Sequence, residues 1–240
     1  MKILILGGTT EARELAERLT ALGHDVTTSL AGRTRRPALP AGQLRVGKFG
    51  GVPGLVGYLK AAGVERLVDA THPYAGLISV NAVAAAQASG VPLIRYMRPA
   101  WDEPADAAWL HVPTIEAAAA ALPPNAHGFI TTGHQGLEYF VGRDDCRLVA
   151  RLIEVPQIDL GHMELLIDTP PHSLASERSL FDRYDFTHLV SKNSGGAATW
   201  AKLDVARERG ATVIMVARPA YGPAHEVGTV DEAVAAVATH

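Results

Sequence analysis

Five short segments of the chain combine glycine or proline with hydroxyl, amide, imidazole or cationic side chains, the groups that bind and orient polar ligands. They are GGTTEA (7–12), DATHPYAG (69–76), TTGHQG (131–136), SKNSGG (191–196) and ARPAYG (217–222). Each is predicted to follow a strand, and in a parallel α/β sheet the loops after the strands lie at the ligand-binding edge. A strand-to-helix loop needs glycine and capping residues in any case, so one such segment would be weak evidence. Five together predict a ligand site.

The first segment lies between an apolar run, Ile3–Leu6, and a helical pattern that begins at Glu11. A helix that starts there directs unpaired backbone N–H groups and the positive end of its dipole toward a bound anion. The segment departs from the G-x-G-x-x-G dinucleotide motif, because Thr9 and Ala12 occupy two of the glycine positions. A threonine hydroxyl here can either cap the helix or bind a phosphate oxygen. We assign the following residues to a cofactor pyrophosphate: Gly7, Gly8, Thr9, Thr10 and Glu11.

The end of the next predicted strand, Asp25–Leu30, distinguishes the two nicotinamide dinucleotides. An NAD site usually has an acidic residue there that binds the ribose 2′-hydroxyl. This chain has Ser29 instead, followed by a basic run of Arg33, Thr34, Arg35 and Arg36. Hydroxyl and guanidinium groups favour a 2′-phosphate, so the sequence predicts NADPH. The alternative is that the basic run is an ordinary solvated loop.

A second anion site is predicted at SKNSGG, which contains a lysine, two short hydrogen-bond donors and two glycines. Because the first segment already serves the cofactor, we assign this one to the substrate, together with part of TTGHQG. The substrate residues are Thr131, Thr132, Gly133, Lys192, Asn193, Ser194, Gly195 and Gly196. In the DATHPYAG segment, Thr71 and His72 are assigned to the cofactor and Tyr74 to the substrate.

Composition and missing motifs exclude several classes of function. The formal net charge of -3 with mixed signs gives no footprint for nucleic acid, and no run of about 18 apolar residues predicts a membrane span. The single cysteine, Cys146, cannot form an internal disulfide, and together with the missing signal peptide it makes the cytoplasm the expected location. No G-x-x-x-x-G-K-[ST] or Y-x-x-x-K motif is present, which argues against phosphoryl transfer and against simple ketone or alcohol substrates. The ten histidines show no metal-ligand spacing, so no metal is assigned.

Strands alternate with helices along the chain, which predicts parallel sheets. The fold class expected is α/β, with two doubly wound, Rossmann-like parallel-sheet domains and an active site in the cleft between them. A proline-rich and acidic stretch, Arg98–Trp109, has no periodicity and predicts a linker. We therefore expect an NADP-binding domain over 1–98 and a second, substrate-side domain over 99–240. The predicted strands are 3–6, 25–30, 44–46, 66–70, 91–96, 128–132, 147–152, 187–191 and 212–216, and the predicted helices are 11–22, 55–62, 77–89, 115–122, 174–183, 197–209 and 231–238.

The segments GGTTEARELA, DATHPYAG, TTG and SKNSGGAATWAKLDVARERGATVIMVARP together make the chain similar to the precorrin-6A reductase family. The resemblance covers nearly the whole chain, with Thr10 at a position where serine is common in the family. It implies an NADPH-dependent enzyme of cobalamin biosynthesis that reduces one double bond of a ring-contracted tetrapyrrole held between the two domains. It also implies transient contacts with other enzymes of the pathway. No motif is matched in 146–183, and the sequence does not distinguish a cobalt-free from a cobalt-containing substrate.

The chemistry leaves two points open. Reduction of a double bond needs a proton donor as well as a hydride, and Lys192, His72, Tyr74 or water could supply the proton. Two other functions also fit a nucleotide-binding domain: an NADP-dependent reductase or epimerase of another small molecule, and a non-catalytic NADP-sensing module. The second domain's polar loops argue against a sensor, because a sensor does not need them.

Overall fold

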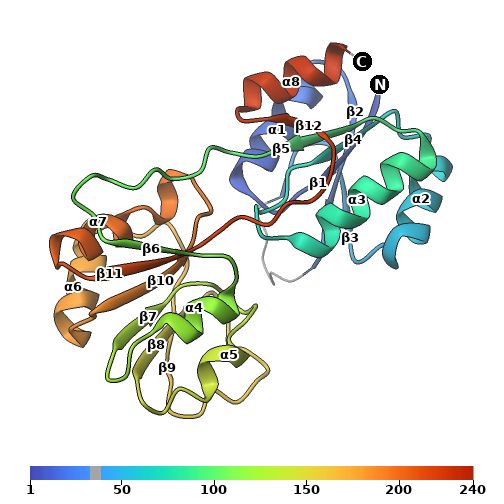
Figure 1. Cartoon of the computed structure of the whole chain (residues 1–240). Coiled ribbons are helices and arrows are strands. Elements are labelled where there is room, and N and C mark those ends of the chain that lie inside the picture. Colours follow the sequence, from blue (N-terminus) through green and yellow to red (C-terminus); the bar gives the residue numbers. More distant parts are fainter. Residues whose placement is uncertain (33–38, 240) are drawn as a thin grey trace. The chain divides into compact units, whose positions relative to one another are not determined.

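A computed structural model describes residues 1–32 and 39–239 of the chain. The chain forms two compact units (Figure 1). The first unit contains Met1–Pro99 and Pro219–His240, and the second contains Ala100–Arg218. Each unit is an α/β structure built on a six-stranded sheet whose strand pairs are all parallel. The expectation of two doubly wound parallel sheets is confirmed.

The sheet of the first unit has the strand order β12-β5-β4-β1-β2-β3. Its strands are β1 (Lys2–Leu6), β2 (Asp25–Leu30), β3 (Gln43–Val46), β4 (Arg66–Asp69), β5 (Leu93–Tyr96) and β12 (His225–Val227). Its helices are α1 (Thr10–Ala21), α2 (Gly51–Ala61), α3 (Gly76–Ser89) and α8 (Val230–Thr239). With strands renumbered within the unit, this is the 3-2-1-4-5-6 order of dinucleotide-binding folds.

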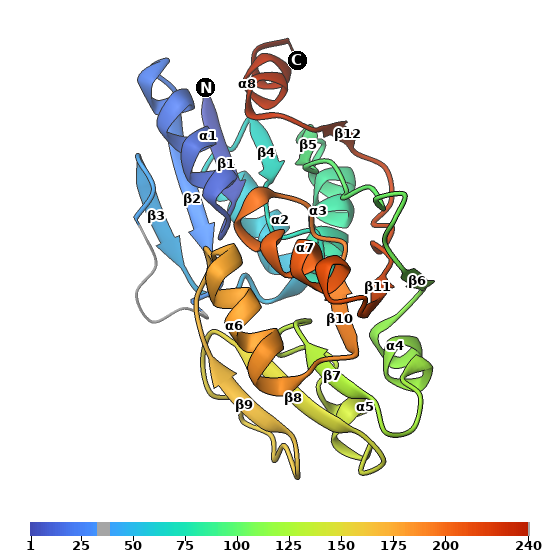
Figure 2. The ribbon, with the colours of Figure 1, turned by 90° about the vertical axis from the view of Figure 1, so that its left-hand side faces the viewer.

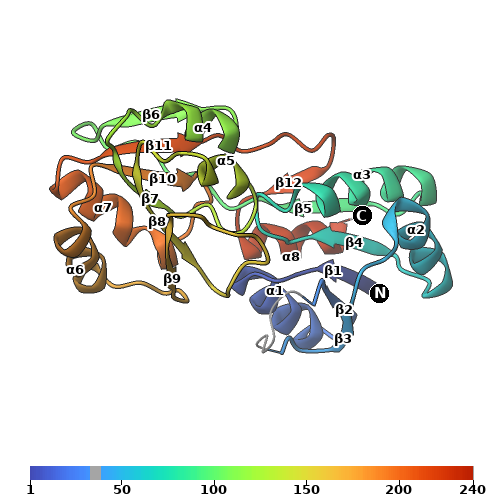
Figure 3. The same ribbon diagram turned by 90° about the horizontal axis from the view of Figure 1, so that it is seen from below.

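The continuous apolar run of β1 follows from its central position. Ile3 and Ile5 belong to an apolar cluster with residues of α1 and α8, whereas Leu4 and Leu6 belong to a cluster with residues of α2 and α3. Successive side chains of a strand point to opposite faces, so a strand covered on both sides needs apolar residues at every position. Figure 3 shows the two helix layers on opposite sides of the sheet.

The expected second domain, 99–240, is too long at its C-terminal end. Residues 219–240 belong to the first unit. Strand β12 pairs with β5, and α8 buries apolar residues such as Ala233 and Val237 in the cluster that contains Leu15 and Leu19 of α1. The sequence indicates a helix here but gives no sign of its partner. The three residues of β12, two of them exposed, are too few and too polar to predict a strand.

The sheet of the second unit has the order β6-β11-β10-β7-β8-β9. Helices α6 and α7 cover one of its faces (Figure 2) and pack on it through Phe181 and Leu203. The strands are β6 (Trp109–Val112), β7 (His127–Ile130), β8 (Arg147–Leu152), β9 (Glu164–Ile167), β10 (His188–Lys192) and β11 (Thr212–Val216). The helices are α4 (Ile115–Ala121), α5 (Glu138–Val141), α6 (Leu174–Tyr184), the 3-10 helix η1 (Ala197–Thr199) and α7 (Ala201–Glu208).

Strands β6, β9 and β12 and helix α5 are absent from the sequence-based expectations. Each of the three strands is an outer strand of its sheet. An edge strand has fewer buried positions than a central one, and in β6 and β9 only Val112 is buried. The apolar run that identifies central strands is therefore missing. The predicted linker accordingly extends to Trp109, which is the first residue of β6.

The packing of α8 predicts the effect of a core substitution in the C-terminal segment. Val237 is fully buried, so Val237→Ala should lower the free energy of unfolding by about 2 kcal/mol through lost burial and a residual cavity. Urea denaturation would measure this. Asp231→Asn on the same helix removes only an exposed ion pair with Arg18 and should change stability by less than about 1 kcal/mol. Equal stability of the wild type and Val237→Ala would contradict the assignment of α8 to this core.

Candidate functional site

The strand order of the first sheet locates the ligand edge. Strand β1 lies beside β4, and from this pair the chain continues to β2 on one side and to β5 on the other. Such a switch point opens a crevice at the carboxyl ends of the strands. The two segments that leave it are GGTTEA and DATHPYAG. A small pocket at this edge is lined by Thr9, Glu11, Thr71, Pro73, Tyr96 and Arg98.

The turn after β1 has the geometry of an anion cradle. Gly8 has φ +122°, a conformation that favours glycine, and a Cβ built on it would have no heavy atom within 4 Å. Thr9 is the N-cap of α1: its hydroxyl accepts a hydrogen bond from the Ala12 N–H at 3.0 Å and donates one to the Ala70 carbonyl at 3.0 Å. The capping role of Thr9 is therefore observed. The open space at Gly8 in front of a helix start fits a phosphate group.

Glu11 lies in the first turn of α1 and forms an ion pair with Arg98, with 3.0 Å between its Oε1 and the guanidinium Nη1. Both side chains line the pocket at the switch point. Arg98 follows β5 and belongs to the stretch in which the sequence predicts only a linker. Its proximity to Glu11 places a cation beside the start of α1, where an anionic ligand benefits from it.

Ser29 lies at the end of β2 and is buried, with 6% of its surface exposed. Its hydroxyl accepts a hydrogen bond from Arg45 of β3 at 3.2 Å. The same guanidinium donates to the carbonyls of Gly47 and Lys48 and stacks on the ring of Phe49, 3.7 Å from the centroid. The sequence does not indicate Arg45, because Arg45 lies on β3 and only the pairing of β3 with β2 places it opposite Ser29. Arg33, Thr34 and Arg35 lie outside the residues that the structure describes.

The segment after β4 is held in a fixed turn. Asp69 accepts hydrogen bonds from the Thr71 hydroxyl at 2.6 Å and from the Thr71 N–H at 3.2 Å. The Nδ1 atom of His72 accepts from the Tyr74 N–H at 3.2 Å, and the two rings lie 5.9 Å apart. An acceptor at Nδ1 places the proton of the neutral imidazole on Nε2.

A buried polar network supports this turn from the C-terminal segment. The Tyr221 hydroxyl donates to the Pro73 carbonyl at 2.6 Å. Asp69 and Arg95 are each only 2% exposed, and Nε of Arg95 lies 3.6 Å from Oδ2 of Asp69. Arg95 also donates to the Gly222 carbonyl at 3.0 Å. Burial, with a further contribution from the Asp69 carboxylate, raises the pKa of Tyr221 to about 12. Tyr221 therefore keeps its proton and acts as a donor.

The second sheet has its own switch point between β7 and β10. The segments that leave these strands are TTGHQG and SKNSGG, so the sequence-predicted substrate segments lie at neighbouring strand ends. Both the backbone N–H and the hydroxyl of Thr131 donate to the Val190 carbonyl, at 3.0 and 2.9 Å. Thr132 is 1% exposed, and its hydroxyl has no hydrogen-bond partner among the described residues. Gly133 has φ +77° and begins the turn.

Asn193 has a role that the sequence does not indicate. Its side-chain oxygen accepts from the Trp101 N–H at 2.7 Å, and its amide nitrogen donates to the Trp101 carbonyl at 3.0 Å. Its own carbonyl accepts from Nε of Arg218 at 2.6 Å. The amide therefore fixes the loop to the segment that precedes β6.

The remaining part of SKNSGG is compact. Ser194 donates its N–H to the Lys192 carbonyl at 2.7 Å, and Gly195 and Gly196 have φ +68° and +83°. The Gly196 carbonyl accepts from the indole N–H of Trp101 at 3.0 Å. Burial lowers the pKa of Lys192 to about 8. Lys192 therefore is still mostly charged at neutral pH but loses its proton far more readily than an exposed lysine.

Two other features of the described residues bear on function. Within 1–32 and 39–239, no three histidine, cysteine or acidic side chains are grouped so that they could hold a metal ion. No helix in this part of the chain has the length and apolar character needed to cross a membrane.

Comparisons with known proteins agree with the motif resemblance. The family model described as precorrin-6x reductase CbiJ/CobK matches residues 2–238. A precorrin-6A reductase of Rhodococcus erythropolis is 41% identical over 240 residues, which are 99% of this chain and 96% of that protein. One of Rhodobacter capsulatus is 41% identical over 94% of this chain and 91% of its own length. A solved structure named CobK precorrin-6A reductase superposes with a TM-score of 0.92 at 38% identity and covers 99% of this chain and 96% of its own.

The Tyr221 hydrogen bond gives a test of the network beneath the HPYA turn. Tyr221→Phe leaves the Pro73 carbonyl without its donor and should lower the free energy of unfolding by about 1 to 3 kcal/mol. Tyr58→Phe in the same unit removes a hydroxyl that has no hydrogen bond to any described residue, and it should have little effect. Urea denaturation of both variants measures the difference. Equal stabilities of the two variants would show that the Tyr221 hydroxyl does not support this turn.

Proposed function

The chain belongs to the precorrin-6x reductase family and is an oxidoreductase of cobalamin biosynthesis; we propose that it reduces one double bond of precorrin-6A with a hydride from NADPH, giving precorrin-6B. The observation that carries the proposal is the anion cradle at Gly8, which lies at the switch point of a sheet with dinucleotide-binding order. The first unit would hold the cofactor, and the second would bind the substrate.

The residues at the edge of the first sheet fit a dinucleotide. Gly7, Gly8 and the first turn of α1 would hold the pyrophosphate, since a Cβ at Gly8 would occupy open space at the helix start. Ser29 and Arg45 lie where the adenosine 2′-phosphate is recognised in this fold. Residues 33–35 are proposed as further partners of that phosphate. When bound, NADPH supplies the hydride, and the protein supplies binding and orientation.

Of the remaining cofactor residues, Thr71 and Glu11 line the pocket at the switch point. Thr71 and His72 follow β4 and would face the nicotinamide half of the dinucleotide, as expected for the strand next to β1 in this fold. Glu11 is already paired with Arg98, so we assign it to holding that guanidinium in place. Thr10 is exposed at the first position of α1; its hydroxyl accepts from Arg13 at 3.0 Å and would donate its proton to a phosphate oxygen.

The substrate of the proposed reaction is a large polyanion with an apolar ring system. Its acetate and propionate groups require separate donors rather than one deep charged pocket. In the second unit, Lys192, Ser194 and the backbone at Gly195 and Gly196 would bind one of these carboxylates. Thr132 has a buried hydroxyl without a partner in the described part of the chain, as expected for a group that completes its hydrogen bonding with a ligand. Asn193 serves the loop itself.

The proton that accompanies the hydride has three side-chain candidates. Lys192 has a pKa lowered to about 8, so it can release a proton close to neutral pH. His72 can donate only through Nε2, because Nδ1 accepts from the Tyr74 N–H. Tyr74 is buried beside that ring, with 8% of its surface exposed. The donor would be the residue whose substitution lowers kcat most while NADPH and substrate still bind.

We assign the substrate to the cobalt-free series, because the two 41% identical relatives are named for precorrin-6A. The test is NADPH oxidation by the purified protein with precorrin-6A, with its cobalt-containing form and with neither. Rapid oxidation only with precorrin-6A is expected. NADPH binding without oxidation would favour a sensor, and oxidation driven only by another substrate would favour a different NADP-dependent enzyme.

Cofactor preference tests the assignment of Arg45. NADPH should bind more tightly than NADH, and Arg45→Met should weaken NADPH binding by about tenfold or more through loss of a charge-assisted contact. NADH affinity should change little. The control is Lys48→Met, which alters an exposed lysine close to Arg45 in the sequence. Fluorescence titration of the three proteins with both cofactors measures the six affinities, and parallel losses for NADPH and NADH in Arg45→Met would show that Arg45 does not contact the 2′-phosphate.

The pKa of Lys192 predicts a pH dependence. Below about pH 8 the side chain is charged and attracts a substrate carboxylate, and above that pH the charge is lost. The kcat/KM for precorrin-6A should therefore decline above about pH 8, and Lys192→Met should remove this decline and lower kcat/KM by about tenfold at pH 7.

NADPH affinity without substrate provides the control measurement for Lys192→Met. It should equal that of the wild type and of Lys60→Met, which alters an exposed lysine on α2. A large loss of NADPH affinity in Lys192→Met would move the SKNSGG segment to the cofactor site.

A further inference from the structure

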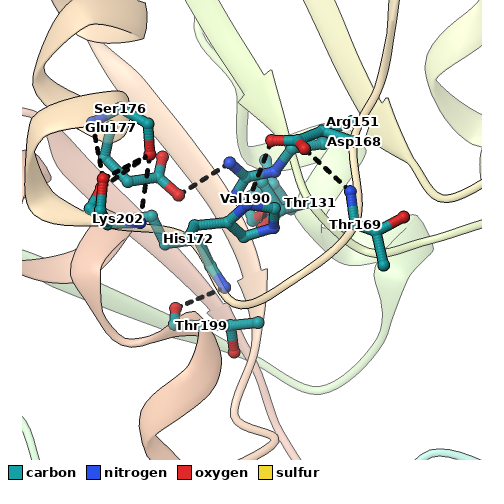
Figure 4. Close-up of polar contacts among 11 residues, drawn as sticks. Thr131, Arg151, Asp168, Thr169, His172, Ser176, Glu177, Val190, Thr199 and Lys202 are labelled. Carbon is teal, nitrogen blue, oxygen red and sulfur yellow. Dashed lines mark hydrogen bonds and ion pairs between the residues drawn. The ribbon is translucent and has the colours of Figure 1, made fainter.

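A cluster of charged side chains is buried in the second unit (Figure 4). It contains Arg151 of β8, Glu177 of α6 and Lys202 of α7, which are 7%, 0% and 4% exposed. Arg151 and Glu177 form an ion pair with 2.7 Å between Nη1 and Oε1. No part of the proposed hydride or proton transfer uses these three residues.

Lys202 is the unusual member, because it forms no ion pair with a carboxylate among the described residues. Its Nζ donates one hydrogen bond, to the Thr199 carbonyl at 3.1 Å, and lies 5.3 Å from the centroid of the Trp101 ring. Burial and the positive charge of Arg151 lower its pKa to about 7, while Glu177 opposes that shift. An apolar side chain of similar volume would avoid the desolvation cost. The lysine therefore has a use other than stability.

The two groups that Lys202 contacts both hold the loop of the proposed substrate site. Thr199 ends η1, which directly follows SKNSGG. The Trp101 backbone pairs with the side-chain amide of Asn193, and the Trp101 indole donates to the Gly196 carbonyl. Lys202 thus fixes the far end of the loop directly and its beginning through Trp101.

A second support comes from the segment before α6. The His172 N–H donates to the Ala198 carbonyl at 3.2 Å, and the His172 ring lies 3.1 Å from a carboxylate oxygen of Asp168. Figure 4 shows the His172 ring among the side chains of Arg151, Glu177 and Lys202. The buried cluster and the loop are therefore connected through two elements, α7 and the segment that leads into α6.

We propose that Lys202 is a positioning residue that holds the SKNSGG loop in the shape required to bind a carboxylate of the substrate, by bonding the Thr199 carbonyl and lying against the Trp101 ring. The proposal rests on the assignment of this loop to the substrate. Arg151 of β8 and Glu177 of α6 lie in the same buried cluster and act on Lys202 through their charges. Lys202 itself contacts neither cofactor nor substrate.

The experiment compares Lys202→Met, which keeps the volume and removes the donor and charge, with Lys202→Arg, which restores both. Arg207→Met, on the exposed side of the same helix, is the matched control. Hydrogen exchange of the amides in 193–199 is measured without ligands, and kcat, KM and NADPH affinity are measured separately. In Lys202→Met the loop amides should exchange about tenfold faster, while amides of β7 and α6 keep wild-type rates.

The kinetic readout separates positioning from folding. Lys202→Met should raise the KM for precorrin-6A or lower kcat by about tenfold, with unchanged NADPH affinity and an unchanged or higher melting temperature. Compared with Lys202→Met, Lys202→Arg should show loop exchange rates and activity close to those of the wild type. Arg207→Met should match the wild type in every measurement.

Two results would overturn the proposal. One is wild-type exchange of 193–199 in folded Lys202→Met, and the other is faster exchange throughout the second unit without rescue in Lys202→Arg, which would indicate a packing role. Failure of the wild type to oxidise NADPH with precorrin-6A would reject the proposed function instead. The exchange measurement would still decide whether Lys202 positions the loop, because it needs no substrate.

Discussion

The hydrogen bond from the Thr9 hydroxyl to the Ala70 carbonyl joins the ends of β1 and β4, the two strands from which the first sheet grows in opposite directions. The same hydroxyl accepts from the Ala12 N–H and so sets where α1 begins. One side chain therefore fixes both the helix start proposed to bind a phosphate and the turn that carries His72. If either element shifted, the other would lose its place relative to the ligand edge. This explains why a threonine occupies a position where the dinucleotide motif has glycine.

The second unit repeats this arrangement with different residues. Thr131 follows β7 and donates both its hydroxyl and its N–H to the Val190 carbonyl of β10. Strands β7 and β10 are again neighbours in the sheet but far apart in the sequence. Such a pair leaves a gap between the loops that diverge from it, and a short hydroxyl side chain closes the gap without filling the crevice above. In both units many of the polar side chains assigned from the sequence follow the strands that are joined in this way, whereas Ser29 lies at the end of β2.

The sequence reveals what is buried and periodic, and it misses what depends on tertiary pairing. The run Ile3–Leu6 predicts a central strand because apolar side chains cover both of its faces. Arg45 and Arg98 are missed because their partners, Ser29 and Glu11, are brought to them by sheet register and by the path after β5. The side-chain amide of Asn193 could bind a ligand, yet it forms hydrogen bonds with the Trp101 backbone. Local sequence cannot separate these two uses of an amide, because both require the same groups.

Each unit also buries an arginine–carboxylate pair beneath a candidate ligand loop: Arg95 with Asp69 in the first, and Arg151 with Glu177 in the second. Such pairs stabilise little, since their desolvation offsets most of the attraction, and apolar replacements are often as stable. What such a pair contributes is hydrogen-bond donors that point in fixed directions. A guanidinium paired with one buried carboxylate has further donors in fixed directions, and Nη1 of Arg95 donates both to the Gly222 carbonyl beside Tyr221 and to the Glu226 carboxylate. An apolar core would hold the strands equally well but would leave the carbonyls of these loops free to rotate. Hydride transfer requires a defined approach of two atoms, so a reductase has reason to accept buried charge where its loops must not move.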